Sequence, residues 1–184
     1  MKVFALGGYG KVGLPAVQLL ARSDLVTEIA IAGRSIERAE KMATEIGKKA
    51  IAVHVDGTDE EKLTALLAGY DIIMNAAAAK AVLPAIRASI RTGVHYCDAA
   101  SFGDFVEQVL KLSSEARAAG ITAIVANGIS PCISNLMGVH VARQMDEVEQ
   151  LQLGRACIFD FQSGRELTPR QWLEDPKESL AALH

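Results

Sequence analysis

The chain has 184 residues, half of them hydrophobic, and a formal net charge of −3. This length suffices for one sizeable core, whereas the acidic balance and the 5% aromatic content argue against a nucleic-acid surface. Three scattered cysteines without C-x-x-C spacing argue against a metal site and a disulfide framework. The apolar stretches are too short for a bilayer span and no signal-peptide pattern opens the chain. We therefore expect a cytoplasmic protein with no membrane partner.

Short apolar runs alternate with longer helical patterns along the first 145 residues. The apolar runs predict strands over residues 2–6, 28–32, 50–55, 71–77, 94–100 and 121–127. The helical patterns predict helices over residues 11–22, 36–47, 59–69, 80–93, 105–120 and 136–145. Strands that are apolar along their length and alternate with helices favour a parallel sheet covered on both faces. We predict an α/β fold, a doubly wound parallel sheet of the Rossmann type.

The pattern changes after residue 145. Residues 148–161 alternate as in a strand, and residues 168–184 read as a helical tail interrupted by proline. We predict a dinucleotide-binding Rossmann domain over residues 1–145. Residues 146–184 are then the beginning of a second, incomplete domain for substrate binding or dimerisation. The alternative is a small carboxy-terminal extension folded back on the sheet.

Three glycines stand between the first predicted strand and the first predicted helix. Gly8, Gly10 and Gly13 match G-x-G-x-x-G as "GYGKVG". We expect Gly8 to permit the tight turn, Gly10 to let a pyrophosphate approach the backbone, and Gly13 to let the helix pack close to the strand. Amide groups at the helix start would then face the phosphates. A glycine-rich turn without a ligand is the alternative, but the repeated strand–helix pattern favours a cofactor-binding loop. That loop comprises Gly8, Tyr9, Gly10, Lys11, Val12 and Gly13.

The end of the second predicted strand indicates which cofactor is bound. NAD sites usually carry Asp or Glu about twenty residues past the glycines, but here that position is Gly33, followed by Arg34 and Ser35. A carboxylate would repel a 2′-phosphate, whereas an arginine and a hydroxyl would bind one. We therefore predict NADP(H) rather than NAD(H). The alternatives are a solvated Arg34 and a Ser35 that only caps a helix; Arg38 could add charge or simply be exposed.

The other strand ends should line the same crevice, because ligands bind outside the carboxyl ends of parallel strands. Asp56 is a candidate for the adenine side, although it could be an ordinary helix cap. The small residues Asn75, Ala76 and Ala77 would let the nicotinamide half pass closely, or else serve tight helix packing. Asp98 also falls at this edge and is the candidate for orienting a substrate or a water. Alternatively, its carboxylate caps a helix or forms a hydrogen bond with the cofactor.

Several motifs occur in an order typical of one family: "GGYGKVGLP", "AGRSIERAEKMA", "HVDGTDEEKL", "DIIMNAA", "HYCDAA" and "NGISPCISNLM". Over about 150 residues the chain resembles the saccharopine dehydrogenase-like NAD(P)-dependent oxidoreductases. The combination of "HYCD" and "SPCISN" is more specific than the glycine motif. The resemblance implies a Rossmann domain followed by an α/β substrate and dimerisation domain. It also implies hydride transfer at an amine or imine carbon of a small amino-acid-like substrate, and a homodimer as one assembly.

The resemblance also implies roles for individual residues. It places Arg34 and Ser35 at the 2′-phosphate, Asp56 on the adenine side, and Asn75, Ala76 and Ala77 along the nicotinamide. It places Tyr96 and Asp98 at the active-site cleft, and Pro131, Ser134 and Asn135 in the loop toward the second domain. Two departures concern the loops. Family members commonly have Gly where this chain has Cys132. After Asp98 they commonly have a Ser or Thr together with an aromatic residue, whereas this chain reads "AASF".

We therefore expect the NADP(H)-binding domain of an oxidoreductase. A segment of this length would bind the cofactor, while turnover would need a substrate domain after His184. One alternative is an NADP(H)-sensing regulatory module, which could end at His184. Another is a Rossmann-like interaction domain whose crevice holds no cofactor.

Overall fold

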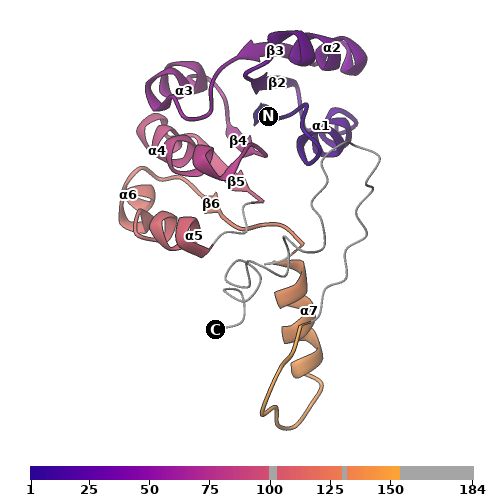
Figure 1. Cartoon of the computed structure of the whole chain (residues 1–184), viewed down its shortest axis with the longest axis vertical. Helices are drawn as coiled ribbons and strands as arrows, with labels where there is room; N and C mark the ends of the chain where they lie inside the picture. The colour runs from indigo at the N-terminus through magenta and orange to yellow at the C-terminus, as the bar shows by residue number, and fades with distance from the viewer. Residues whose placement is uncertain (100–102, 130–131, 154–184) are drawn as a thin grey trace, which may run out of the picture. The chain divides into compact units, whose positions relative to one another are not determined.

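The structure is a computed structural model that describes residues 1–99, 103–129 and 132–153. The chain divides into two compact units, Met1–Gly128 and Ile129–His184. The first unit contains a six-stranded, fully parallel sheet in the order β3-β2-β1-β4-β5-β6. Its strands are β1 (Lys2–Leu6), β2 (Glu28–Gly33), β3 (Ala50–His54), β4 (Ile72–Asn75), β5 (His95–Asp98) and β6 (Ala123–Ile124). This arrangement confirms the predicted doubly wound Rossmann fold (Figure 1).

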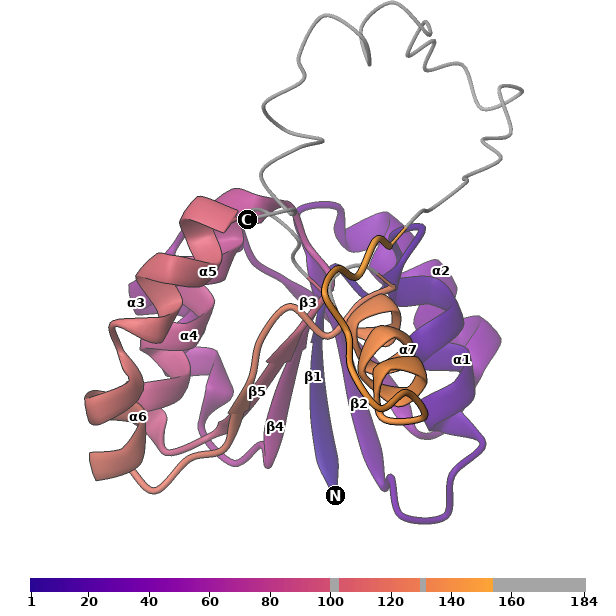
Figure 2. The same cartoon turned by 90° about the horizontal axis from the view of Figure 1, so that it is seen from below.

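Helices cover both faces of the sheet. Figure 2 shows α1 (Gly13–Ala21) and α2 (Ile36–Ile46) on one side of it. The other side carries α3 (Glu60–Leu67), α4 (Val82–Thr92), α5 (Gly103–Leu110) and α6 (Ser113–Ala118). A short 3-10 helix, η1 (Ala79–Ala81), leads from β4 into α4. None of the helices in the described ranges is both long enough and apolar enough to cross a lipid bilayer.

The central strand shows why both faces are covered. Val3 and Ala5 of β1 pack into the core beneath α1 and α2, whereas Phe4 and Leu6 pack into the core beneath α3 and α4. All four side chains are at most 1% exposed. Successive side chains of a strand point to opposite faces, so an uninterrupted apolar run requires a cover on each side.

Several element boundaries differ from the prediction. The helix predicted over residues 105–120 is two helices, and the Ser113 hydroxyl donates to the Leu110 carbonyl at the break. Such a bond competes with a continuous helical ladder. The helix predicted over residues 59–69 is α3, which spans Glu60–Leu67. Asp59 caps it, because its carboxylate accepts from the Lys62 amide. The preceding Thr58 instead donates its hydroxyl to Asp56.

The second unit begins with α7 (Ile133–Ala142), three residues before the helix predicted at residue 136. A Cβ at Gly138 would lie 2.7 Å from Leu151 Cδ2, so the segment after the helix packs against it. Residues 148–153 form no strand, contrary to the prediction, and residues 154–161 of that predicted strand lie outside the described residues. α7 belongs to the second unit, whereas the predicted domain boundary follows residue 145; that boundary stays a prediction.

Candidate cofactor-binding site

The candidate site lies where the strand order reverses. β1 pairs with β2 on one side and with β4 on the other, so that Leu6 is in register with both Ala32 and Asn75. This pairing brings the loop after β1, the end of β2 and the end of β4 to one edge. In open α/β sheets, ligands bind at such a point, where the chain leaves the neighbouring strands in opposite directions. The predicted loop 8–13, residues 33–35 and residues 75–77 therefore come together.

The tight turn after β1 is made by Gly7, which corrects the prediction that Gly8 makes it. Gly7 has a φ of 76°, in the left-handed region that favours glycine, whereas Gly8 is not among the glycines with positive φ. The Gly7 amide donates to the Ala32 carbonyl at 2.7 Å. A Cβ on Gly7 would lie 2.8 Å from the Ala76 carbonyl, so no larger residue fits between β1 and β4. The doubled glycine in "GGYG" was the signal for this position.

Gly13 confirms the predicted close packing of helix on strand. A Cβ there would overlap the Gly7 carbonyl oxygen and lie 2.7 Å from Gly8 Cα. A Cβ on Gly10 would meet only the Gly7 carbonyl oxygen, at 3.0 Å, so that side of the loop is open. The amides of Val12 and Gly13 have no hydrogen-bond acceptor among the described residues. The start of α1 thus offers two unsatisfied N–H groups, which is the chemistry that a diphosphate requires.

The end of β2 carries a positive charge rather than a carboxylate. Arg34 is exposed directly after Gly33. Ser35 caps α2, since its hydroxyl oxygen accepts from the Arg38 amide at 3.3 Å and its hydroxyl donates to Glu37 at 2.8 Å. The pKa of Glu37 is lowered by a backbone hydrogen bond and by this Ser35 hydroxyl. Ser35 is therefore the helix cap that the sequence offered as one of its roles, and its contact with a phosphate stays a prediction.

Tyr9 links the glycine loop to this strand end. Its hydroxyl oxygen accepts from the Ser35 amide at 2.9 Å. The Arg38 guanidinium carbon lies 4.7 Å from the centre of the Tyr9 ring, and Arg38 Nη2 donates to the Tyr9 carbonyl at 3.1 Å. Arg38 is thus exposed, but its guanidinium is held by Tyr9.

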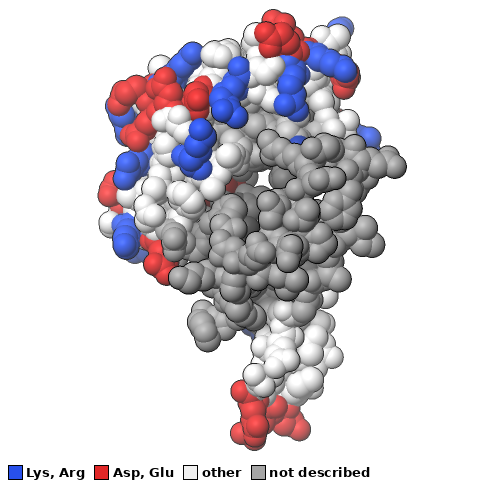
Figure 3. Space-filling model, viewed as in Figure 1, with Lys and Arg blue, Asp and Glu red and all other residues white. Residues whose placement is uncertain are grey.

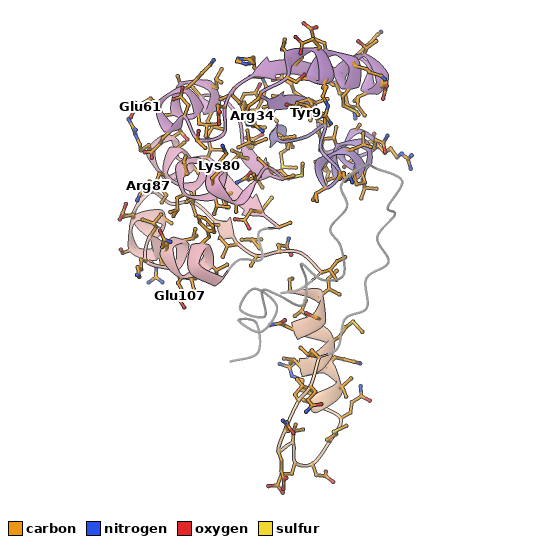
Figure 4. All side chains as sticks on the ribbon, in the orientation of Figure 1. Tyr9, Arg34, Glu61, Lys80, Arg87 and Glu107 are labelled. Atoms are coloured by element: carbon orange, nitrogen blue, oxygen red, sulfur yellow. The ribbon has the colours of Figure 1, made fainter. Side chains whose placement is uncertain are left out.

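Asp56 is a loop-stabilising carboxylate close to two cations. Its Oδ1 accepts from both the amide and the hydroxyl of Thr58, each at 2.9 Å. These bonds hold the pKa of Asp56 below its ordinary value, and the charges of Lys80 and Arg34 lower it further. Figure 4 shows Arg34 and Lys80 at the same end of the sheet as Tyr9. Lys80, in η1, was not singled out in the sequence, because only the fold brings the chain after β4 next to the ends of β2 and β3.

A buried polar network lies at the ends of β4 and β5. Asn75 Nδ2 donates to the Tyr96 hydroxyl at 3.1 Å, and Tyr96 donates to Asp98 Oδ2 at 2.8 Å. Asn75 Oδ1 accepts from the Ala77 amide at 3.1 Å, which shapes the predicted nicotinamide segment. Burial, followed by the charge of Asp98, raises the pKa of Tyr96. Asn75, Tyr96 and Asp98 are each at most 5% exposed.

The carboxylate of Asp98 is already engaged by the protein. Besides Tyr96, it accepts from the Ala126 amide at 2.9 Å, and the Asp98 carbonyl accepts from the Asn127 amide at 2.8 Å. Asp98 therefore fixes the chain where it leaves β6, and its predicted role in orienting a substrate or a water stays untested. Burial and the charge of Asp98 raise the pKa of the neighbouring Cys97, which favours the thiol over the thiolate.

The remaining predicted residues lie beyond the first unit or outside the described ranges. Cys132 has a φ of 99°, a conformation that glycine adopts more readily, so the backbone there keeps a glycine-like shape despite the cysteine. Ser134 and Asn135 belong to the second unit, and Pro131 lies outside the described residues. Within the described ranges, no group of three or more His, Cys, Asp or Glu side chains could hold a metal ion.

Charged side chains are mixed in sign over the visible face of the first unit (Figure 3). Neither sign forms an extended field there, and so the charges that matter for a ligand are the local ones at the strand ends.

Comparisons with known proteins agree with this geometry. A family model described as "Saccharopine dehydrogenase NADP binding domain" matches residues 3–124. The apo structure of saccharopine dehydrogenase (L-Glu forming) from Saccharomyces cerevisiae is 26% identical, with a TM-score of 0.67 over 78% of this chain and 31% of that one.

More distant structures share the fold alone. An NADPH complex of a quinone oxidoreductase from Escherichia coli is 18% identical, with a TM-score of 0.51 over 67% of this chain and 47% of that one. A triphenylmethane reductase from Citrobacter sp. with NADP(H) is 16% identical, with a TM-score of 0.52 over 68% and 48% of the two chains. The present chain thus spans about a third to a half of the length of these structures.

Proposed function

Since this chain belongs to the saccharopine dehydrogenase NADP binding domain family, we propose that it is the cofactor-binding part of an oxidoreductase acting on an amino-acid-like substrate. NADP(H) would supply or accept a hydride at its nicotinamide ring, and the substrate would be oxidised or reduced at an amine or imine carbon. The chain spans 31% of the yeast enzyme's length, so most substrate contacts would come from residues beyond this sequence.

The observation that carries the proposal is the pair of phosphate-binding features at the switch point. The unsatisfied amides of Val12 and Gly13 suit a diphosphate, and the open side of Gly10 lets it approach. Gly33 stands where a carboxylate would select NAD, and the exposed Arg34 follows it directly. The proposed cofactor-binding residues are Gly8, Tyr9, Gly10, Lys11, Val12, Gly13, Gly33, Arg34, Ser35, Asp56, Asn75, Ala76 and Ala77.

The proposed roles follow the order of the strands. The loop 8–13 would hold the pyrophosphate, and Arg34 with Ser35 the 2′-phosphate. Asp56 would lie on the adenine side, and residues 75–77 beside the nicotinamide. Asp98 is the candidate for orienting the substrate or a water, through a carboxylate that Tyr96 and the Ala126 amide already hold in place. A cytoplasmic location and a homodimer complete the proposal, on the strength of the sequence pattern and the family resemblance.

The test is a titration of the purified chain with NADPH and NADH. We expect tight binding of NADPH and weak binding of NADH, because a charge-assisted contact with the 2′-phosphate is worth about 1.5–3 kcal/mol, which is roughly a 10- to 150-fold preference. Arg34→Gln should remove most of that preference. Arg87→Gln on α4 is the control, because it removes the same charge from a side chain that is 53% exposed.

Equal affinities for the two cofactors in the wild-type chain would defeat the proposed 2′-phosphate site. Hydride transfer is then assayed on a longer protein that includes the residues after His184, with amino acids as candidate substrates. NADPH binding without turnover across that class would favour the regulatory module over the enzyme.

A further inference from the structure

We infer that Tyr9 acts beside Arg34 in setting the cofactor preference of this site: its ring excludes an acidic side chain at position 33, and it presents its own hydroxyl and the Arg38 guanidinium to the 2′-phosphate. The inference rests on the proposed NADP(H) site and adds how that site discriminates. It assigns to Tyr9 a role that the glycine motif does not specify, since the residue between the first two glycines is variable in that motif.

The first step concerns the space above Gly33. A Cβ built on Gly33 would lie 2.7 Å from Tyr9 Cζ and 2.8 Å from Tyr9 Cε1, and closer still to the hydroxyl oxygen. Gly33 is not among the residues with positive φ, so its backbone would accept an L side chain. The requirement for glycine at position 33 therefore comes from the Tyr9 ring and not from the backbone conformation.

The second step is that Tyr9 is not free to swing aside. Moving the ring would break its hydrogen bond from the Ser35 amide and its stack with Arg38. It would also leave the Ser35 amide without that acceptor at the start of α2. An aspartate or glutamate at position 33, which would bind the ribose hydroxyls of NAD, and the observed position of Tyr9 thus exclude one another.

The third step concerns the hydroxyl hydrogen of Tyr9. The hydroxyl oxygen accepts from the Ser35 amide, and its own hydrogen has no acceptor among the described residues. A phenol that already accepts one hydrogen bond is well placed to donate to an anion next to that amide. A phosphate oxygen beside Ser35 would supply the missing acceptor.

The fourth step concerns Arg38. It lies in the first turn of α2, where the helix dipole disfavours a cation. Arg34 lies just before the same helix, so two arginines belong to an end that favours anions. Arg38 uses one N–H on the Tyr9 carbonyl and keeps its ring stack, which leaves further donors of its planar fork for a ligand. A bound phosphate would place an anion at this helix end.

The experiment compares the affinities of four variants for NADPH and NADH, together with their melting temperatures. Tyr9→Phe keeps the ring and removes the hydroxyl, so NADPH should bind about 3- to 10-fold more weakly with NADH unchanged. Arg38→Gln should weaken NADPH about tenfold with NADH unchanged. Arg87→Gln serves again as the charge-matched control. Gly33→Asp alone should lower the melting temperature and weaken both cofactors, whereas Gly33→Asp combined with Tyr9→Ala should bind NADH more tightly than NADPH.

The outcomes separate this inference from the proposed function. A wild-type chain that binds neither cofactor would defeat the proposed function itself. A wild-type chain that prefers NADPH, with Tyr9→Phe and Arg38→Gln leaving that preference intact, would overturn the inference alone. Gly33→Asp that folds normally and prefers NADH while Tyr9 is present would also overturn it. If Gly33→Asp fails to fold, the two variants that keep Gly33 still decide the question.

Discussion

Replacing Tyr96 by phenylalanine tests whether the buried network at the strand ends is structural. The ring is 1% exposed and would stay packed, so only the hydroxyl is lost. That hydroxyl accepts from Asn75 and donates to Asp98, and both partners are buried. Each buried polar group left without its partner costs about 1–3 kcal/mol. Since the side-chain nitrogen of Asn75 keeps only a long bond to the Ala81 carbonyl at 3.5 Å, we expect Tyr96→Phe to lower the free energy of unfolding by about 2–4 kcal/mol.

The assay is urea unfolding followed by circular dichroism, with Tyr70→Phe as the matched control. The Tyr70 ring makes an edge-to-face contact with Phe4 at 5.3 Å, which phenylalanine would keep. Its side chain is only partly buried, so water can replace the lost hydroxyl contact, and we expect a loss of less than about 1 kcal/mol. A loss for Tyr96→Phe no larger than that for Tyr70→Phe would refute the reasoning, because it would mean that Asn75 and Asp98 find other partners at little cost.

Three further predictions follow from the same contacts. Gly13→Ala should lose about 1–3 kcal/mol of stability, because its Cβ would overlap the Gly7 carbonyl. Gly10→Ala should lose less stability but still weaken NADPH binding. Thermal melts measure the stability of both variants, and titrations measure their NADPH affinity. Burial and Glu28 raise the pKa of Tyr70 to about 12, so its contribution to stability is complete below pH 10 and is lost as the pH rises toward 12; the decline between pH 9.5 and 11.5 should be shallower in Tyr70→Phe. Asp98→Asn should reduce stability while NADPH still binds, because its carboxylate holds Tyr96 and the Ala126 amide; a large loss of turnover in a longer protein at unchanged stability would instead support the proposed role of Asp98 in orienting the substrate or a water.

The strands of the first unit are predictable because their burial is simple. Ile29 and Ile31 face one helical layer, and Ala30 and Ala32 face the other, so the run is apolar without a break. No local feature of these residues competes with the strand. The strand order then follows from the handedness of the crossovers and from the glycine loop after β1.

The length of β6 (Ala123–Ile124) could not be predicted from its local sequence pattern. The apolar run over residues 121–127 predicts a full strand, but pairing stops after Ile124. Ala126 adopts a φ of 55°, and its amide bonds the carboxylate of Asp98. This bond joins residues that lie far apart in the sequence, so no pattern within residues 121–127 indicates it.

Helix faces were harder to predict than strands. Val12, Val17 and Leu19 all match an apolar helical pattern, yet only Val17 is buried, while Val12 is 58% and Leu19 68% exposed. Val12 lies at the cap of α1, in the loop that offers its amide to a ligand. Core packing therefore does not explain the apolar side chain of Val12.

The candidate site combines a local part and a long-range part. The local part, the glycines and Arg34, is readable because each residue acts through its own backbone or charge. The long-range part depends on Tyr9 reaching Gly33 and Ser35, and on Lys80 approaching Asp56. Because Tyr9 both occupies the volume of an acidic side chain and holds Arg38, we expect a switch to NADH through an acidic residue at position 33 to need a second substitution at Tyr9. A single exchange at position 33 would meet a ring already anchored by the start of the next helix, and so the NADP preference is built into the loop as much as into the strand end.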